Sequence, residues 1–154
     1  PTYTLNYSRI AAYFINEYRR QYKFCNIHQG AIDCFNKLNI SGINQSVLSA
    51  SMESDLYSFI LHFKLSHQFT HFSGVTDIFA AGKSNISIKH LKKLNSNNLK
   101  VLLVGDTLHD AEVAQKLDVD CLLFSGGHNS REILSESTYQ IVDSFDEIYQ
   151  YILD

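Results

Sequence analysis

The sequence lacks the features that direct a protein to a membrane or to nucleic acid. Its 154 residues contain no apolar run close to the roughly 18 residues of a spanning helix, and its N-terminus lacks the basic and then apolar order of a secretory signal. Thirteen lysines and arginines stand against sixteen acids, with no basic block for nucleic acid. We therefore expect neither a membrane nor a nucleic-acid partner, and a small molecule is the default ligand.

Cysteine is also scarce. Cys25, Cys34 and Cys121 are odd in number and show no CxxC spacing, which argues against zinc ligation. Buried thiols in a reducing, cytoplasmic setting are the simplest interpretation of these residues. With 45% hydrophobic residues the chain can bury one ordinary core, so we expect one main domain.

The most informative segment runs from Val101 to Asp110. Four consecutive aliphatic residues predict a strand buried on both faces, and a glycine and two carboxylates follow before a helical pattern begins at Ala111. Ligands bind at the carboxyl edge of an open parallel sheet. Paired carboxylates there suit Mg²⁺ better than a soft metal, so Asp106 and Asp110 are candidate metal ligands.

Strands and helices alternate along most of the chain. We expect helices over 5–22, 31–38, 53–63, 84–94, 111–117, 130–135 and 145–153, and strands over 43–48, 101–104, 119–124 and 140–142. This alternation, with helices of about ten residues, predicts parallel βαβ units. The expected fold is therefore α/β, a Rossmann-like three-layer core with a parallel sheet behind a helical N-terminal extension.

Three short motifs follow one another at the ends of these elements. The strand over 43–48 ends in Ser49-Ala50-Ser51, Gly82-Lys83 comes later, and the strand over 101–104 ends in Gly105-Asp106. Because the carboxyl ends of parallel strands share one edge, a hydroxyl, an ammonium group and carboxylates can converge there.

This order of motifs resembles the haloacid dehalogenase-like (HAD) superfamily, and the resemblance covers about residues 28–146. In that superfamily a hydroxyl residue ends the second core strand, a lysine follows, and a GDxxxD segment ends a later strand. The phrases 48–51, 105–110 and Gly126-Gly127-His128 are similar to its phosphoglycolate-phosphatase-like branch. The resemblance implies a helical cap remnant and linker over 1–24, followed by the α/β core over 25–154.

The resemblance also implies a function, the Mg²⁺-dependent hydrolysis of a small phosphate monoester through an aspartyl-phosphate. It makes Asp106 a ligand of the ion, and Asp110 a residue that holds the coordination shell of the ion in place. Lys83 would pair with the phosphoryl oxygens, and Ser49 Oγ and the Ala50 amide would donate hydrogen bonds to them. The partner would be a small phosphorylated metabolite, whose identity these residues do not specify, and the oligomeric state stays open.

One part of the superfamily pattern is missing from this sequence. The nucleophile is the first aspartate of a DxD segment that ends the first core strand, and Asp118-Val119-Asp120 has this spacing but precedes a strand. The missing strand lies in the middle of the family's sheet, so its neighbours would expose unpaired backbone groups. We therefore expect an N-terminal portion beyond these residues and a visible gap, rearrangement or substitute strand. We expect this chain as it stands to be inactive or severely impaired.

Each candidate residue also has a structural interpretation. Asp110 stands where a helix N-cap belongs, Ser49 could be a loop hydroxyl, and Lys83 could be a solvated surface charge. His109 and His128 lie near the same edge, where they could touch substrate, and no catalytic role is assigned to them.

Two other functions remain open. A catalytically inactive HAD-like binding or regulatory module would bind a phosphorylated ligand or a partner protein, and an upstream in-frame strand followed by DxDxT or DxDGT would favour the enzyme instead. A phosphoacceptor receiver domain is the weaker alternative, because receivers place their acids before the lysine, whereas Lys83 precedes Asp106.

Overall fold

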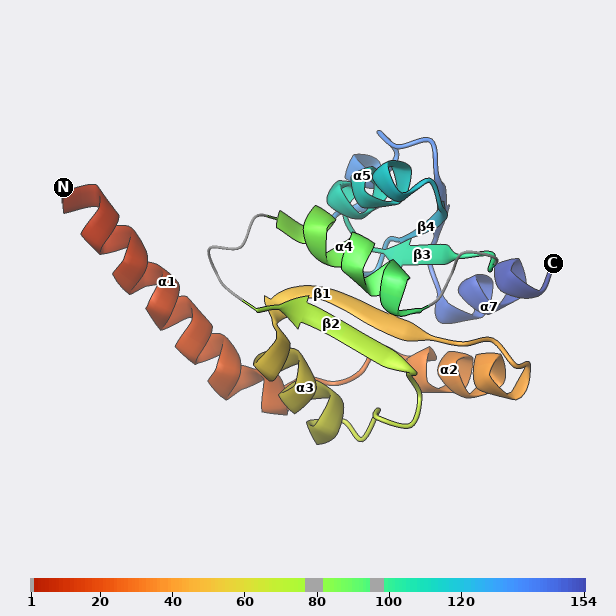
Figure 1. The fold of residues 1–154 in the computed structure, drawn as a ribbon, viewed down its shortest axis with the longest axis horizontal. Helices are drawn as coiled ribbons and strands as arrows, with labels where there is room; N and C mark the ends of the chain where they lie inside the picture. Colours follow the sequence, from red (N-terminus) through yellow and green to blue (C-terminus); the bar gives the residue numbers. More distant parts are fainter. Residues whose placement is uncertain (1, 77–81, 95–98) are drawn as a thin grey trace.

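The computed structural model describes the backbone of residues 2–76, 82–94 and 99–154, and the side chains of 9–76, 86–94 and 99–154 (Figure 1). The helices are α1 (Thr2–Gln21), α2 (Ala31–Ile40), α3 (Glu53–His62), α4 (Gly82–Lys93), α5 (Leu108–Leu117), α6 (Arg131–Leu134) and α7 (Phe145–Leu153), with a short 3₁₀ helix at Tyr22–Phe24. The strands are β1 (Ser46–Met52), β2 (His71–Val75), β3 (Leu102–Gly105), β4 (Asp120–Phe124) and β5 (Gln140–Val142).

The α/β fold expected from the sequence is confirmed, and some element bounds differ. The strand predicted over 43–48 begins at Ser46 and continues to Met52. The helix predicted from Ala111 begins three residues earlier, at Leu108. Strand β2 was not predicted, because His71–Val75 contains a serine and a glycine among its five residues and shows no clear alternation.

The strands form two parallel sheets instead of one. Strand β1 pairs with β2, and β3, β4 and β5 pair in that order. Among the residues that the structure describes, no strand is hydrogen-bonded between β1 and β3, and the arrows of these two strands point the same way (Figure 1). The sheet is therefore interrupted, as expected for a core without its central strand.

The interruption changes the burial of β3. Its sequence predicts a strand buried on both faces, but Val104 is 42% exposed and Leu102 and Leu103 are only partly buried. This prediction was wrong because β3 lies at the edge of a three-stranded sheet, with a paired neighbour on the β4 side only.

The hydrophobic core surrounds β4, the middle strand of the second sheet. Leu122 packs with Cys34 and Leu38 of α2 and with Ile148 of α7 on one face. The other face of β4 packs against α5 and α6, in a cluster of Ala111, Ala114, Cys121, Leu123 and Leu134. Each fully buried leucine contributes roughly 1.5–3 kcal/mol, so β4 and its two helix layers hold this half of the molecule together.

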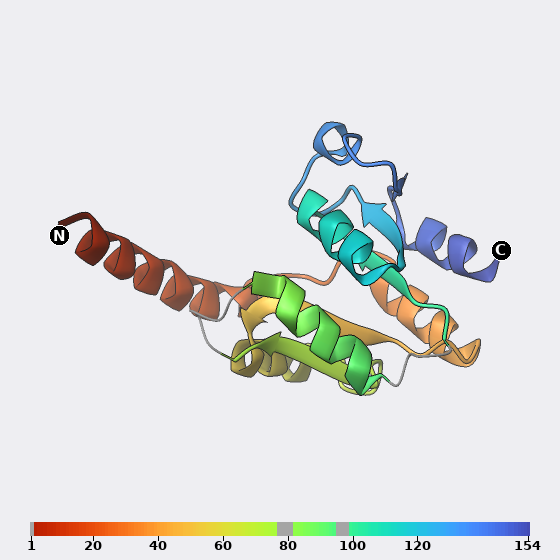
Figure 2. The same ribbon diagram turned by 45° about the horizontal axis from the view of Figure 1, so that its top comes forward.

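The first sheet lies between α3 and α4 (Figure 2). Helix α4 is joined to both strands by His90, whose Nδ1 lies 2.9 Å from Ser73 Oγ and whose Nε2 lies 2.9 Å from Ser46 Oγ. His90 is buried, and this burial lowers its pKa, with smaller contributions from His71 and Lys93.

Helix α1 extends away from the rest of the molecule (Figures 1 and 2). Its C-terminal part is held on α3 by a bidentate pair, in which Arg19 Nε and Nη2 each donate to Asp55 at 2.9 Å. The rings of Tyr18 and Tyr22 pack on Phe59. None of the described helices, α1 included, is long and apolar enough to cross a membrane.

Candidate active site

The turn between β3 and α5 is organised by Asp110. Its Oδ2 accepts hydrogen bonds from the Asp106 amide at 3.1 Å, from the Thr107 amide at 3.1 Å and from Thr107 Oγ1 at 2.7 Å. Thr107 Oγ1 in turn accepts from the Asp110 amide, which completes a capping box. The N-cap of α5 is therefore Thr107, and Asp110 is the third residue of the helix, a correction to the position expected for it.

Glycine is required immediately before this turn. A Cβ atom placed on Gly105 would lie 2.3 Å from Asp110 Cβ and 2.7 Å from its Oδ2. The missing side chain lets the buried Asp110 carboxylate lie against the end of β3. The Gly-Asp-x-x-x-Asp pattern is thus explained, in part, by packing and capping.

Asp106 is in contact with the loop that follows β4. His128 donates to Asp106 Oδ2 from its backbone amide at 2.8 Å, and His128 Nδ1 lies 2.8 Å from the same oxygen. The Asn129 amide donates to the Asp106 carbonyl at 3.2 Å, and the Leu108 amide donates to Asn129 Oδ1 at 3.0 Å. Sequence reasoning placed His128 near this edge but found no sign of this contact.

Ser49 and Ala50 lie where β1 becomes irregular. Regular pairing of β1 with β2 covers Ser46 to Leu48 and resumes only at Met52. Ser49 Oγ accepts a hydrogen bond from the Ser51 amide at 3.1 Å, so its own O–H is still able to donate. The irregular segment therefore places the hydroxyl of the partly buried Ser49 beside the exposed Ala50.

The structure brings some of the predicted site residues together. Asp106 and Asp110 share one turn, whereas in the described part of the chain no hydrogen bond joins them to Ser49 or Ala50. Lys83 lies in the first turn of α4, and its side chain is outside the described residues. The convergence of all these groups at one edge therefore stays a prediction.

Two of the three cysteines, Cys34 and Cys121, are buried and poorly suited to act as nucleophiles. Burial, together with the nearby charge of Asp110, raises the pKa of the Cys121 thiol to about 12. Burial likewise raises the pKa of Cys34. Thiolates are the reactive form, so these two residues act as core side chains. Cys25 is exposed, contrary to the expectation of buried thiols throughout.

The model of the haloacid dehalogenase-like hydrolase family matches residues 4–124, most of the chain. This chain therefore belongs to the haloacid dehalogenase-like (HAD) hydrolase family. The match agrees with the resemblance seen in the motifs and excludes the receiver-domain alternative. No curated protein sequence matches the chain.

Solved structures share the fold of this member of the HAD family. A predicted phosphatase from Clostridium acetobutylicum is 23% identical with a TM-score of 0.78, over 83% of this chain and 60% of that one. A predicted phosphoglycolate phosphatase from Haemophilus somnus is 18% identical with a TM-score of 0.73, over 92% and 63%. Protein Tyrosine Kinase A from Mycobacterium tuberculosis is 18% identical with a TM-score of 0.80, over 93% and 68%.

These similarities establish the fold and leave the reaction open. A phosphatase and a protein named as a kinase share it at similar identity, so the function must be argued from the site. The chain also spans only 60% of the first of these structures.

One described side chain at this turn fits what a magnesium ion requires of a ligand. In the part of the chain covered by the structure, no group of three His, Cys, Asp or Glu residues could hold a metal ion. Mg²⁺ is usually held by one or two carboxylates, with waters and substrate phosphates completing its shell. Asp106, with a side chain 35% exposed, fits one such ligand position. Asp110 instead supports the Asp106 backbone with Oδ2.

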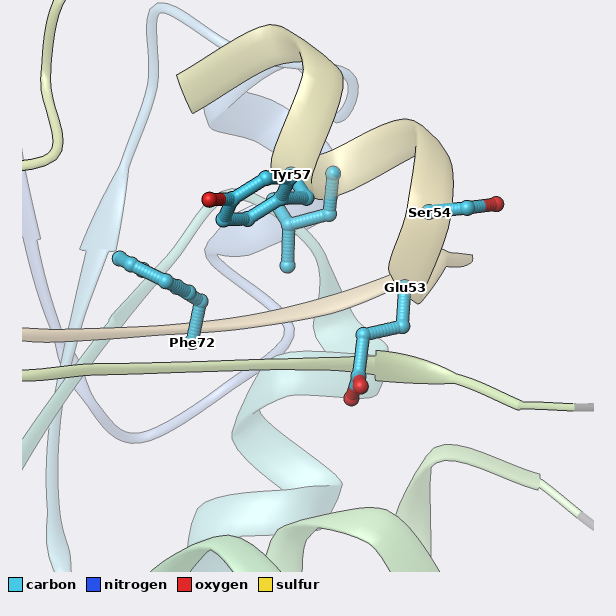
Figure 3. A pocket seen from close by; sticks show the side chains of 5 residues that line it. Glu53, Ser54, Tyr57 and Phe72 are labelled. Atoms are coloured by element: carbon cyan, nitrogen blue, oxygen red, sulfur yellow. The ribbon is translucent and has the colours of Figure 1, made fainter. Parts of the chain in front are cut away.

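A separate hollow lies on the outer side of the first sheet. It is lined by Glu53, Ser54, Leu56, Tyr57 and Phe72, and Figure 3 shows Ser54 pointing away from it. The walls are the rings of Tyr57 and Phe72, which meet edge to face. None of the candidate site residues whose side chains the structure describes lines this hollow, so it differs from the predicted site.

Proposed function

We propose that this chain forms most of the α/β core of a phosphatase that hydrolyses a small phosphate monoester with the help of Mg²⁺. The interrupted sheet is the observation that carries the proposal. Strands β1 and β3 each have one paired neighbour, and Ser49 and Asp106 follow their regular parts. A further parallel strand between them would end between these two residues, where a nucleophilic carboxylate is needed.

The two acids of the turn after β3 have different roles in this proposal. Asp106 supplies one carboxylate ligand of Mg²⁺, and the bound ion would screen the acids from an incoming phosphate. Asp110 holds the turn that presents Asp106, through its bonds to the Asp106 and Thr107 amides. In enzymes of this kind the support of a ligand matters nearly as much as the ligand itself.

The phosphoryl group would be bound from the β1 side. Ser49 Oγ and the Ala50 amide donate hydrogen bonds to its oxygens, and Lys83 contributes a positive charge. The nucleophile that attacks phosphorus has no counterpart within these residues, and the proposal assigns it to the strand between β1 and β3. The 154 residues alone are therefore expected to be inactive.

The setting of the reaction follows from the same residues. Three unpaired thiols suit a reducing compartment, and we propose a cytoplasmic enzyme acting on a phosphorylated metabolite, with neither nucleic acid nor membrane as partner.

A chain extended upstream in the reading frame tests this function. We expect it to hydrolyse members of a panel of phosphate monoesters when Mg²⁺ is present and to stop when the ion is chelated. Asp106→Asn should lower kcat at least about 100-fold, because it removes a charged ligand from a site that works by electrostatic stabilisation.

Asp118→Asn is the matched control. Asp118 is also an acid beside α5, but it lies at the C-terminal end of that helix with a φ of 54°, which asparagine tolerates. The kcat of the Asp118→Asn variant should stay unchanged. Full turnover by Asp106→Asn would overturn the assignment of Asp106.

The alternative is an inactive HAD-like module that binds a phosphorylated ligand. The engagement of Asp110 Oδ2 in capping favours it. Phosphate-ester binding without turnover by the extended chain would support this module over the enzyme.

A further inference from the structure

We propose that His128 is a positioning residue for Asp106, one that fixes the rotamer of the Asp106 carboxylate and leaves its second oxygen directed to a metal ion. The inference rests on the proposed function in its last part only, since that part assumes that Asp106 is a metal ligand. The fixing of the rotamer stands on contacts between the turn after β3 and the loop after β4.

Both hydrogen bonds from His128 reach the same oxygen. The backbone amide and Nδ1 each lie 2.8 Å from Asp106 Oδ2, so one residue holds this oxygen from two directions. Among the described residues none donates to Oδ1. A carboxylate held through one oxygen keeps its orientation, and the other oxygen stays available as a ligand.

The preceding residue allows this contact. A Cβ atom on Gly127 would lie 2.2 Å from Asp106 Oδ2 and 2.3 Å from Asp106 Cβ, so only glycine lets the loop backbone come so close. Asn129 then secures the loop on the other side, with its amide on the Asp106 carbonyl and its Oδ1 on the Leu108 amide. The loop thus contacts both the side chain and the backbone of Asp106.

The exposure of His128 and Asp106 indicates that their contact positions the carboxylate and adds little to the stability of the fold. The His128 side chain is 88% exposed and that of Asp106 is 35% exposed. Exposed pairs contribute little to stability because water screens them. Removing the ring should therefore leave the fold intact and loosen the carboxylate, which then keeps only its bond to the His128 amide.

The ring must carry its proton on Nδ1 to donate to Asp106. In a neutral imidazole the other nitrogen, Nε2, is then an acceptor on the exposed side of the ring. This tautomer gives the proposal a spectroscopic signature that does not depend on any metal.

NMR of the metal-free protein tests the positioning directly. We expect a protonated Nδ1 in His128 and Hα–Hβ couplings of Asp106 that belong to a single rotamer. His128→Ala removes the ring contact and keeps the amide bond, so it should partly average these couplings without lowering the unfolding temperature. His128→Asn should keep them, because its Nδ2 can take the place of Nδ1.

His109→Ala is the matched control. His109 lies on the same edge and is also exposed, but its ring faces Glu112 at 3.1 Å instead of Asp106. Its loss should leave the Asp106 couplings unchanged. An unprotonated Nδ1, or couplings that His128→Ala leaves unaltered, would overturn the inference.

A second experiment uses Mn²⁺ as a probe. Its binding is measured from the broadening of the Asp106 amide signal. His128→Ala should weaken Mn²⁺ binding at least about tenfold, as loss of a ligand's supporting bond usually does, whereas His128→Asn should stay within about threefold. If Asp106→Asn leaves Mn²⁺ binding unaltered, the metal role in the proposed function fails while the rotamer result stands. If Asp106→Asn abolishes binding and His128→Ala does not weaken it, the link from His128 to the metal is wrong.

Discussion

His90 is a buried polar residue whose contribution to the stability of the fold depends on its charge. Its two ring nitrogens lie 2.9 Å from hydroxyls on β1 and β2, and its pKa is lowered by burial and by the nearby His71 and Lys93. Since a protonated ring would carry an unpaired charge into this site, the neutral form holds α4 on the first sheet.

Stability should therefore fall as the pH is lowered below the ordinary value of 6.5 for histidine. Between that value and the lowered pKa of the folded state, the unfolded chain binds more protons, so the free energy of unfolding decreases with decreasing pH. Urea unfolding at pH 7.5 and pH 5.5 measures this slope. His90→Gln should lose about 1–3 kcal/mol at the higher pH and should flatten the slope.

The exposed His62 supplies the control for this measurement. Its ring packs on the rings of Tyr22 and Phe63, so His62→Gln should keep the pH slope of the unaltered protein. An equal slope in His90→Gln would show that other groups cause the pH dependence.

The candidate site also shows which residue properties can be read from sequence. Asp106 and Asp110 follow directly from an aliphatic run and a glycine, because both depend on neighbours close in the chain. The contact of His128 with Asp106 joins two loops 22 residues apart, and no local pattern encodes it.

At the scale of the elements, local signals again predicted best. Strand β5 and helix α7 have the bounds expected, since Ser144 caps the helix and donates to Glu147 in the same turn. Strand β2 was missed because it is defined by parallel pairing with β1. The irregularity of β1 depends on Gly74, because the missing side chain lets the backbone of Glu53 and Ser51 lie close to it. This packing has no local sequence signal.

Helix α5 allows the capping interpretation to be tested. Thr107 Oγ1 both accepts from the Asp110 amide and donates to Asp110 Oδ2, so Thr107→Ala should destabilise the protein by about 1–2 kcal/mol. Thr107→Ser keeps both bonds and should cost only a small part of that. Chemical denaturation measures the difference, and equal stability of the two variants would contradict the capping role.

At the scale of the whole molecule, the two sheets are connected by helices. Helix α4 packs on the first sheet and on α5, and α2 packs on α7. The layers of an α/β fold are therefore continuous, while its hydrogen-bonded sheet is not. The sequence predicted the discontinuity through the missing DxD strand, but its position between β1 and β3 became visible only when strand pairing was known.

Hydrogen exchange should reveal this discontinuity. In the 154-residue chain the amides of β4 have paired strands on both sides and should exchange slowest, whereas β1 and β3 should each contain amides that exchange at least about tenfold faster. In a chain extended upstream, a strand inserted between β1 and β3 would slow exchange on both. The outer strands β2 and β5 supply the control, because their free edges face away from the insertion and should be unaffected. Slower exchange in β2 or β5 alone would place the added strand at an outer edge, and the nucleophile would then lie too far from Asp106 for the proposed site.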